Sequence, residues 1–274
     1  MAAKLYCIAV KSDKQLDTRI LSCVDYIIYS PEKYDVKIVE RFLFQCTMHN
    51  AQCTIKDETT EKAPSIYLDL PVIAMSKDIK ILRDILSNNE IKEKLAGIVA
   101  NNIYALKLAE EYGLDVFKGL GMNTLNDNFC GFNNIILSPE LNERDYRLFK
   151  GWDKKNFFLC VYGRLPLMAL AHCLYRANGF DCRNCEGAKL QYKDEPGNIM
   201  DIRRIRLASC FFELLNSVPL NLLNYKNKVK PHYYFDMRET EKAEILRILK
   251  LFKEPGNKEP EGKYTTGLYF KEVK

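Results

Sequence analysis

Residues 97–119 read GIVANNIYALKLAEEYGLDVFKG and contain one complete alternation of strand and helix. Gly97–Val99 and Val116–Gly119 are short β-rich runs, which predict buried strands. Between them, Ile103–Tyr112 carries apolar residues at three- and four-residue steps, as a helix that covers a sheet requires. Gly113 is a helix stop before the second strand. The stretch is therefore typical of a βα unit in a parallel sheet.

The same rhythm extends in both directions from this unit. It predicts seven or eight strands, and therefore an α/β fold of the (β/α)8 TIM-barrel type, either complete or distorted and incomplete. An open doubly wound sheet is the competing topology. The other predicted strands are Leu5–Val10, Tyr26–Tyr29, Ser65–Leu68, Asn134–Ser138, Phe157–Tyr162 and His232–Met237; the other predicted helices are Val36–His49, Asp78–Leu86, one that Ser138–Glu143 opens and that runs through Phe149, and Glu239–Phe252.

The rhythm breaks after Phe157–Tyr162 for an inserted segment that carries cysteines. Within it, Leu190–Arg206 predicts a β-hairpin that turns at Asp194–Asn198. We expect residues 1–252 to form the barrel module, including a cysteine-rich insertion at 171–217. Residues 253–274 should be a polar linker and a short terminal strand, Tyr264–Val273.

The composition is that of a globular chain with a substantial core. The chain has 274 residues, 47% of them hydrophobic, and a net charge of +5, which is too mild to demand a nucleic-acid partner. The N-terminus has no signal-peptide pattern, and no apolar run reaches the ~18 residues of a membrane span. These features indicate a cytoplasmic protein with no membrane partner. Thiols stay reduced in the cytoplasm, so we interpret the ten cysteines as core residues, metal ligands or reactive groups rather than disulfides.

Three cysteines gather in the insertion: Cys173, Cys182 and Cys185. The two-residue gap between the last two lets both sulfurs converge on one ion, and a tetrahedral site usually takes four ligands. The best fourth ligand is Cys210, and His172 is the alternative. Zn²⁺ and a [4Fe–4S] cluster both accept four thiolates, so the spacing does not separate them; a chance pair or a redox pair is the competing interpretation. The other cysteines, Cys7, Cys23, Cys46, Cys53, Cys130 and Cys160, show no ligand-like grouping.

Four ordered blocks of this chain resemble the peptidase U32 family, also called the collagenase-like protease family. The match is to the C-terminal module of its long two-module members. Asn134–Asn142 is similar to the family strand that ends in Ser-Pro-Glu-Leu, and Val161–Met168 to its Tyr-Gly-Arg-x-Pro-Leu-Met block. Leu215–Leu220 resembles its Asn-Ser-x-Pro-Leu block, and Tyr264–Gly267 its Thr-x-Gly ending.

The resemblance implies a barrel with a peptidase (hydrolase) label and no agreed catalytic residues. Relatives hydroxylate RNA bases or the ubiquinone ring and bind [4Fe–4S] clusters through four cysteines, which here correspond to Cys173, Cys182, Cys185 and Cys210. It also implies a second U32-type module or a partner subunit. The chain departs from the family in two places: the Glu-x-Phe-x-x-Gly-Ser/Ala-x-Cys signature is missing, and an expected Asp-Arg pair reads Asp194-Glu195.

Polar residues at predicted strand ends are the catalytic candidates, because barrel chemistry is built there. Glu140 could equally be a helix N-terminal carboxylate, and Arg164 could simply pair with a carboxylate. No His-Glu-x-x-His motif is present, and the histidines form no recognisable arrangement with Ser138 or Ser217. The candidates are Asn101, Asn123, Glu140, Arg164 and Asp236.

The leading hypothesis is a U32-type peptidase module with a four-cysteine metal site. The alternatives are an iron–sulfur module that supports hydroxylation of RNA bases or a small aromatic substrate, and a non-catalytic, zinc-stapled binding domain. RNA is a further partner to consider, because Tyr233-Tyr234-Phe235 would stack on bases if these rings were exposed. Alternation along a strand favours a core position for some of them.

Overall fold

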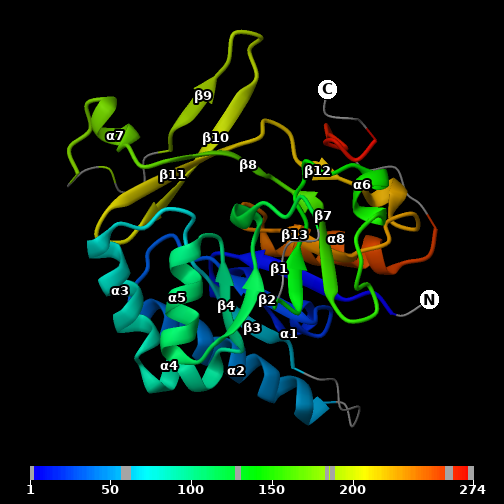
Figure 1. Cartoon of the computed structure of the whole chain (residues 1–274), viewed down its shortest axis with the longest axis horizontal. Coiled ribbons are helices and arrows are strands. Elements are labelled where there is room, and N and C mark those ends of the chain that lie inside the picture. The colour runs from blue at the N-terminus through cyan, green and yellow to red at the C-terminus, as the bar shows by residue number, and fades with distance from the viewer. Residues whose placement is uncertain are drawn as a thin grey trace.

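The computed structural model describes residues 3–56, 63–126, 131–182, 185, 189–256 and 262–270, with side chains except at 50–56. Eight parallel strands form a barrel (Figure 1): β1 (Tyr6–Val10), β2 (Tyr26–Tyr29), β3 (Ser65–Asp69), β4 (Gly97–Ala100), β5 (Asp115–Lys118), β6 (Asn134–Ile136), β7 (Asn156–Gly163) and β13 (His232–Asp236). They pair in the order β7-β13-β1-β2-β3-β4-β5-β6, and β6 pairs back to β7. The barrel is therefore closed. Closure confirms the predicted (β/α)8-type fold and excludes the open doubly wound sheet.

Helices lie around the outside of the barrel and connect most of its strands. Between β5 and β6 the described residues, which exclude 127–130, contain a short 3₁₀ turn and no α-helix. The α-helices around the barrel are α1 (Thr18–Leu21), α2 (Val36–Lys56), α3 (Ser76–Leu86), α4 (Asn89–Lys94), α5 (Ile103–Tyr112), α6 (Glu143–Arg147) and α8 (Lys242–Lys253); the 3₁₀ turns are η1 (Asp13–Gln15), η2 (Leu120–Met122) and η3 (Leu223–Tyr225).

The predicted βα unit of residues 97–119 forms β4, α5 and β5. The side chain of Asn102 caps α5 by accepting a hydrogen bond from the amide of Ile103 at 2.6 Å. Gly113 ends the helix in the left-handed region, at φ 64°, where a side chain would be unfavourable. The sequence signals for the start and the end of this helix are confirmed.

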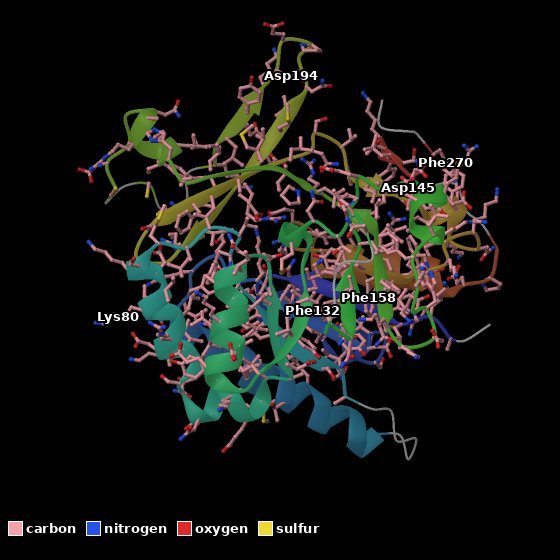
Figure 2. All side chains as sticks on the ribbon, in the orientation of Figure 1. Lys80, Phe132, Asp145, Phe158, Asp194 and Phe270 are labelled. Carbon is pink, nitrogen blue, oxygen red and sulfur yellow. The ribbon has the colours of Figure 1, made fainter. Side chains whose placement is uncertain are left out.

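Side chains alternate between the barrel interior and the layer beneath the helices. On β1, Cys7 and Ala9 belong to the interior cluster, whereas Ile8 packs with the helices. Large rings fill the interior, such as Phe117 and Phe158, whose ring centroids are 5.1 Å apart; Phe158 lies among the strands in Figure 2. The barrel is a packed core, which leaves its ends for chemistry.

A second sheet interrupts the barrel between β7 and β13. Its strands are β8 (Pro166–Leu170), β9 (Gln191–Lys193), β10 (Ile199–Arg206) and β11 (Cys210–Leu215), in the antiparallel order β8-β11-β10-β9. Helix α7 (Leu174–Ala177) follows β8, and β12 (Leu220–Asn221) pairs antiparallel with β7. The predicted hairpin is confirmed as β9 and β10, and Figure 2 shows Asp194 at its projecting tip.

This inserted sheet lies across the carboxyl ends of the barrel strands (Figure 1). The amide of Arg206 donates to the carbonyl of Glu32 at 2.8 Å, and the amide of Tyr34 donates back to the carbonyl of Arg206 at 2.9 Å. The amide of Ser209 donates to Oδ1 of the fully buried Asp78 at 2.8 Å. Hydrogen bonds to the β2–α2 loop and to α3 therefore hold the sheet in place.

One predicted helix forms but is shorter than expected, and one predicted strand is wrong. The helix expected to open at Ser138–Glu143 and run through Phe149 is α6, which ends at Arg147. It begins after Asn142, whose side chain caps it by accepting from the amides of Arg144 and Asp145. The predicted strand Tyr264–Val273 does not form within its described part. Thr265 makes an isolated bridge with Leu220, and the chain then turns at Gly267, whose φ is 58°.

The aromatic run on β13 lies in the core. Tyr233, Tyr234 and Phe235 are 4%, 3% and 0% exposed, so the expected core position is confirmed and the exposure that stacking on RNA bases would need is not met. Their burial follows from the closed barrel, in which both faces of each strand are covered.

Of the helices that the structure describes, none combines the length and the apolar character needed to cross a bilayer.

Candidate functional site

A cavity of about 260 Å³ opens at the carboxyl ends of the barrel strands, beneath the inserted sheet. We call it the mouth cavity. Its volume is close to the lower end of the ~300–1,000 Å³ usual for small-molecule sites. Its charged and other polar lining residues are Lys11, Ser30, Glu32, Asp69, Asn101, Asn123, Ser138, Glu140, Arg203, Arg204, Glu213 and Arg238, and its apolar walls include Ile28, Val99, Ile136 and Tyr234.

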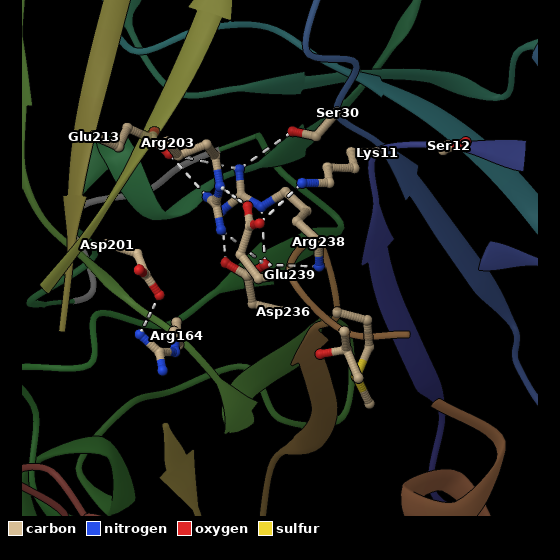
Figure 3. A network of polar contacts seen from close by, with 12 residues as sticks. Lys11, Ser12, Ser30, Arg164, Asp201, Arg203, Glu213, Asp236, Arg238 and Glu239 are labelled. Carbon is tan, nitrogen blue, oxygen red and sulfur yellow. Dashed lines mark hydrogen bonds and ion pairs between the residues drawn. The ribbon is translucent and has the colours of Figure 1, made fainter. Parts of the chain in front are cut away.

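Two buried arginines organise one side of the mouth cavity (Figure 3). Arg203, on β10, donates to Glu213 at 2.9 Å and to Glu239 at 2.8 Å. Arg238, which follows β13, makes a bidentate pair with Asp236 at 2.9 and 2.6 Å. The side chain of Arg203 is 5% exposed and that of Asp236 is 0% exposed. The network therefore joins the inserted sheet to the barrel through charges that are shielded from water.

These arginines set the ionisation of the carboxylates around them. Burial alone would raise the pKa of Asp236, but the guanidiniums of Arg238 and Arg203 outweigh it and hold the pKa below its ordinary value. Burial likewise opposes ionisation of Glu239, while Arg203 and Lys11 lower its pKa below normal. Both groups are therefore charged at neutral pH.

Asp69, at the end of β3, behaves differently. Burial raises its pKa above the ordinary value, and the more distant guanidinium of Arg238, at 3.6 Å, only partly opposes this. Its Oδ1 accepts a hydrogen bond from Nδ2 of Asn101 at 2.7 Å, and its Oδ2 accepts one from the hydroxyl of Ser30. A carboxyl group with a raised pKa, fixed in a cavity, is suited to giving or taking a proton.

The structure brings most of the predicted catalytic candidates to this cavity. Asn101 and Glu140 line it, and Glu140 is exposed at its rim. Asn123 also lines it, in the left-handed region at φ 43°, and its Oδ1 accepts a hydrogen bond from Oγ of Ser138 at 2.6 Å. Asp236 belongs to the buried network. Arg164 does not line the cavity; it pairs with Asp201 at 2.6 Å beside a neighbouring hollow.

Several residues of the site were missed by sequence reasoning. Ser30 and Asp69 directly follow predicted strands, so a search of every strand end would have found them. Arg203 and Glu213 have no such signal, because they reach the cavity only through their cross-strand pairing on β10 and β11. Arg238 follows β13 by two residues.

The predicted metal cysteines lie on the opposite face of the inserted sheet. Arg204 follows Arg203 on β10, and its Nη1 donates to the carbonyl of Cys185 at 2.9 Å and lies 3.2 Å from that residue's Sγ. Cys210 begins β11, and Cys173 precedes α7. Burial raises the pKa of the Cys210 thiol, the charges of Cys173 and Cys185 add to this rise, and Arg204 opposes it. Three of the four thiols therefore share one electrostatic environment.

The fourth cysteine, Cys182, is exposed, and its carbonyl rather than its thiol accepts a hydrogen bond from Sγ of Cys185, at 3.3 Å. Within the described ranges, no three His, Cys, Asp or Glu side chains are arranged to hold a metal ion. The donor set fits a thiolate centre in its chemistry, with four thiols on one insertion, but the sulfurs are not in ligand geometry. His172, the alternative ligand, is exposed.

The remaining thiols behave as core or incidental residues where they are described. Cys7, Cys46 and Cys160 are buried, and Cys23 is half-buried. The side chain of Cys53 and the whole of Cys130 lie outside the described residues.

None of the described residues that line the mouth cavity is a histidine or a cysteine, so they include neither a Ser–His nor a Cys–His pair. His232 lies at the other end of the barrel, where its Nδ1 accepts a hydrogen bond from the amide of Leu5 at 3.1 Å. The hydroxyl of Ser138 donates to an amide oxygen, and that of Ser30 to a carboxylate that Asn101 already engages. Ser138 therefore donates to a group that is not a base, whereas Ser30 donates to the Asp69 carboxylate, which is a potential base.

Three of the four resembling blocks meet in space. Gly163, in the Tyr-Gly-Arg block, pairs with Leu220 of the Asn-Ser-x-Pro-Leu block. The amide of Thr265, in the terminal block, donates to the carbonyl of Pro219 at 3.0 Å, and its carbonyl accepts from Asn221 at 2.9 Å. These blocks therefore form one structural unit at the side of β7.

Comparisons with models of protein families, with curated proteins and with solved structures gave no match to this chain. Membership of the U32 family therefore stays a prediction that rests on the blocks.

Proposed function

We propose that this chain is a U32-type module that holds a [4Fe–4S] cluster through Cys173, Cys182, Cys185 and Cys210 and acts on a small aromatic substrate or an RNA base in the mouth cavity. The observation that carries the proposal is the placement of two neighbouring residues of β10. Arg203 reaches the mouth network on one face of the inserted sheet, and Arg204 contacts Cys185 on the other. The thiols and the cavity are thus separated by a single sheet.

Each part has a distinct task in this proposal. When bound, the cluster supplies electron transfer. The mouth cavity binds the substrate: Ile28, Val99 and the ring of Tyr234 offer apolar contact, while the buried arginines hold fixed charges around it. Asp69 moves the proton, because its raised pKa lets it carry one closer to neutral pH than an ordinary aspartate can.

The cavity favours this function over proteolysis. A peptide substrate needs an extended groove and an activated nucleophile, whereas this cavity is small and covered by β8, β10 and β11. The peptidase hypothesis would require Ser138 to change its hydrogen-bond partner, or Ser30 to be activated by Asp69 without a histidine. We therefore rank it second, although the family label favours it.

The test is metal analysis of anaerobically purified protein. We expect brown protein with about four iron and four sulfide per chain. Cys210→Ser should lose them, and Cys23→Ser, which removes a half-buried thiol outside the insertion, should keep them. A colourless protein with one zinc that Cys210→Ser releases would instead support the zinc-stapled domain. Protein without metal would refute the centre, and proteolysis abolished by Ser138→Ala but kept in Cys210→Ser would favour the peptidase.

A further inference from the structure

Arg204 is held in one orientation beside the cysteines. Its guanidinium lies over the ring of Tyr175, 4.9 Å from the ring centroid, and Tyr175 is 4% exposed. The cross-strand partner of Arg204 is Phe212, which is 0% exposed and packs against the same tyrosine ring, with centroids 5.7 Å apart. This packing directs the donors of Arg204 toward Cys185, whose carbonyl and sulfur lie 2.9 and 3.2 Å from Nη1.

The charge of Arg204 is available to sulfur. Among the described residues, no carboxylate forms an ion pair with Arg204, whereas the neighbouring Arg203 pairs with Glu213, Asp236 and Glu239. Arg204 therefore differs from the arginine next to it in what it can stabilise. A guanidinium that stacks on a ring and donates in its own plane is a group that lysine does not replace equally.

The positive charge of Arg204 matches the negative charge of a thiolate metal centre. Four thiolates around a divalent ion or a [4Fe–4S]²⁺ core leave a net charge of about −2, which is costly to hold in a half-buried site. Hydrogen bonds from a charged group to a ligand sulfur orient that ligand and offset its charge. On the same face, Arg206 is the cross-strand partner of Cys210.

We propose that Arg204 is a positioning residue of the thiolate centre, which fixes the sulfur of Cys185 and offsets the negative charge of the bound metal site. The inference rests on the proposed function only for the existence of that centre. It requires neither the cluster nor any substrate, so a simple divalent ion can test it.

The experiment is an anaerobic titration of the full-length, metal-free chain with Co²⁺, read through the sulfur-to-cobalt charge-transfer absorption. We expect Arg204→Gln to weaken Co²⁺ binding by about 10–100-fold, as is usual when a partner of a metal ligand is lost. Arg204→Lys should bind with intermediate affinity, because it keeps the charge without the planar donors. Lys193→Gln removes a positive charge from an exposed position of the same sheet and should bind like the wild type.

The outcomes separate the two ideas. If the wild type shows the thiolate–cobalt band, Cys210→Ser loses it, and Arg204→Gln binds as tightly as the wild type, the role of Arg204 is overturned while the centre stands. If the wild type shows no such band, both are overturned. Should Arg204→Gln lose its circular dichroism spectrum, Arg204→Lys decides: wild-type affinity and an unshifted band in that folded variant would also overturn the role.

Discussion

Replacing Arg203 with methionine tests whether the buried network holds the inserted sheet on the barrel. The variant keeps the length of the side chain and removes its charge. Asp236 would retain its bidentate partner Arg238, and Glu239 would retain Lys11 at 2.9 Å. Glu213 would be left with Arg238 alone, at 3.9 Å, while its side chain is 6% exposed. The variant therefore leaves one buried carboxylate without a close partner.

We expect Arg203→Met to lower the free energy of unfolding by about 3–5 kcal/mol, the usual cost of breaking a buried ion pair from one side. That is a large part of the ~5–15 kcal/mol that stabilises a typical domain. Adding Glu213→Gln to the variant should recover part of the lost stability, because it removes the buried negative charge that has no close partner after Arg203 is replaced. The assay is urea unfolding followed by circular dichroism at neutral pH, with a chelator present so that metal content is equal.

Arg164→Met is the matched control. It breaks the Arg164–Asp201 pair, whose side chains are 28% and 43% exposed, and should cost less than about 1 kcal/mol. The reasoning is refuted if Arg203→Met costs no more than this control. It is also refuted if the double variant is less stable than Arg203→Met, since the stranded carboxylate would then not be the source of the loss.

Three further predictions concern single positions. Because the pKa of Asp69 is raised in the folded protein, its carboxyl group lowers the free energy of unfolding as pH rises above about 4. We expect Asp69→Asn to remove this pH-dependent loss from a series of unfolding free energies measured at different pH values. An unchanged pH dependence would contradict the prediction. Gly163, at φ 128°, leaves no room for a Cβ beside the backbone of Asp236, so Gly163→Ala should cost about 3 kcal/mol or more. Gly151→Ala, where a Cβ would make only ordinary contact with the Lys155 side chain, should cost about 1–2 kcal/mol, and equal thermal shifts would argue against the close approach. Lys226 donates at 2.5 Å to the carbonyls of Leu251 and Glu254 at the end of α8. Lys226→Met should therefore lower the free energy of unfolding by about 2 kcal/mol and speed amide exchange in that turn. The control Lys250→Met, at an exposed position of α8, should have neither effect.

The barrel could be predicted because its signals are local. In residues 97–119, the helix cap, the apolar spacing and the glycine stop all act within one unit, and the structure keeps them. The terminal strand was predicted wrongly for the opposite reason: its pairing depends on a distant partner, and among its described residues, 264–270, only Thr265 finds one, at Leu220. Signals that need a neighbour from elsewhere in the chain are weak in a single sequence.

The same distinction applies to the site. Asn101, Asn123 and Glu140 could be predicted because parallel strands bring their carboxyl ends together. Asp69 directly follows the predicted strand Ser65–Leu68, so the same rule reaches it although it was not among the candidates. Arg203 could not be predicted from the sequence, because only the register of β10 against β11 shows which face of the inserted sheet it occupies.

Pro166 and Leu215 are opposite each other where the inserted sheet begins and ends. The chain therefore leaves the barrel and returns to it at almost one point, and everything between these residues could be excised and replaced by a short turn. A barrel trimmed in this way would keep its eight strands but expose Asp236 and Arg238 to water. Such a barrel could carry a different inserted segment over its strand ends, so the insertion that shapes the cavity and the barrel that supports it could diverge independently.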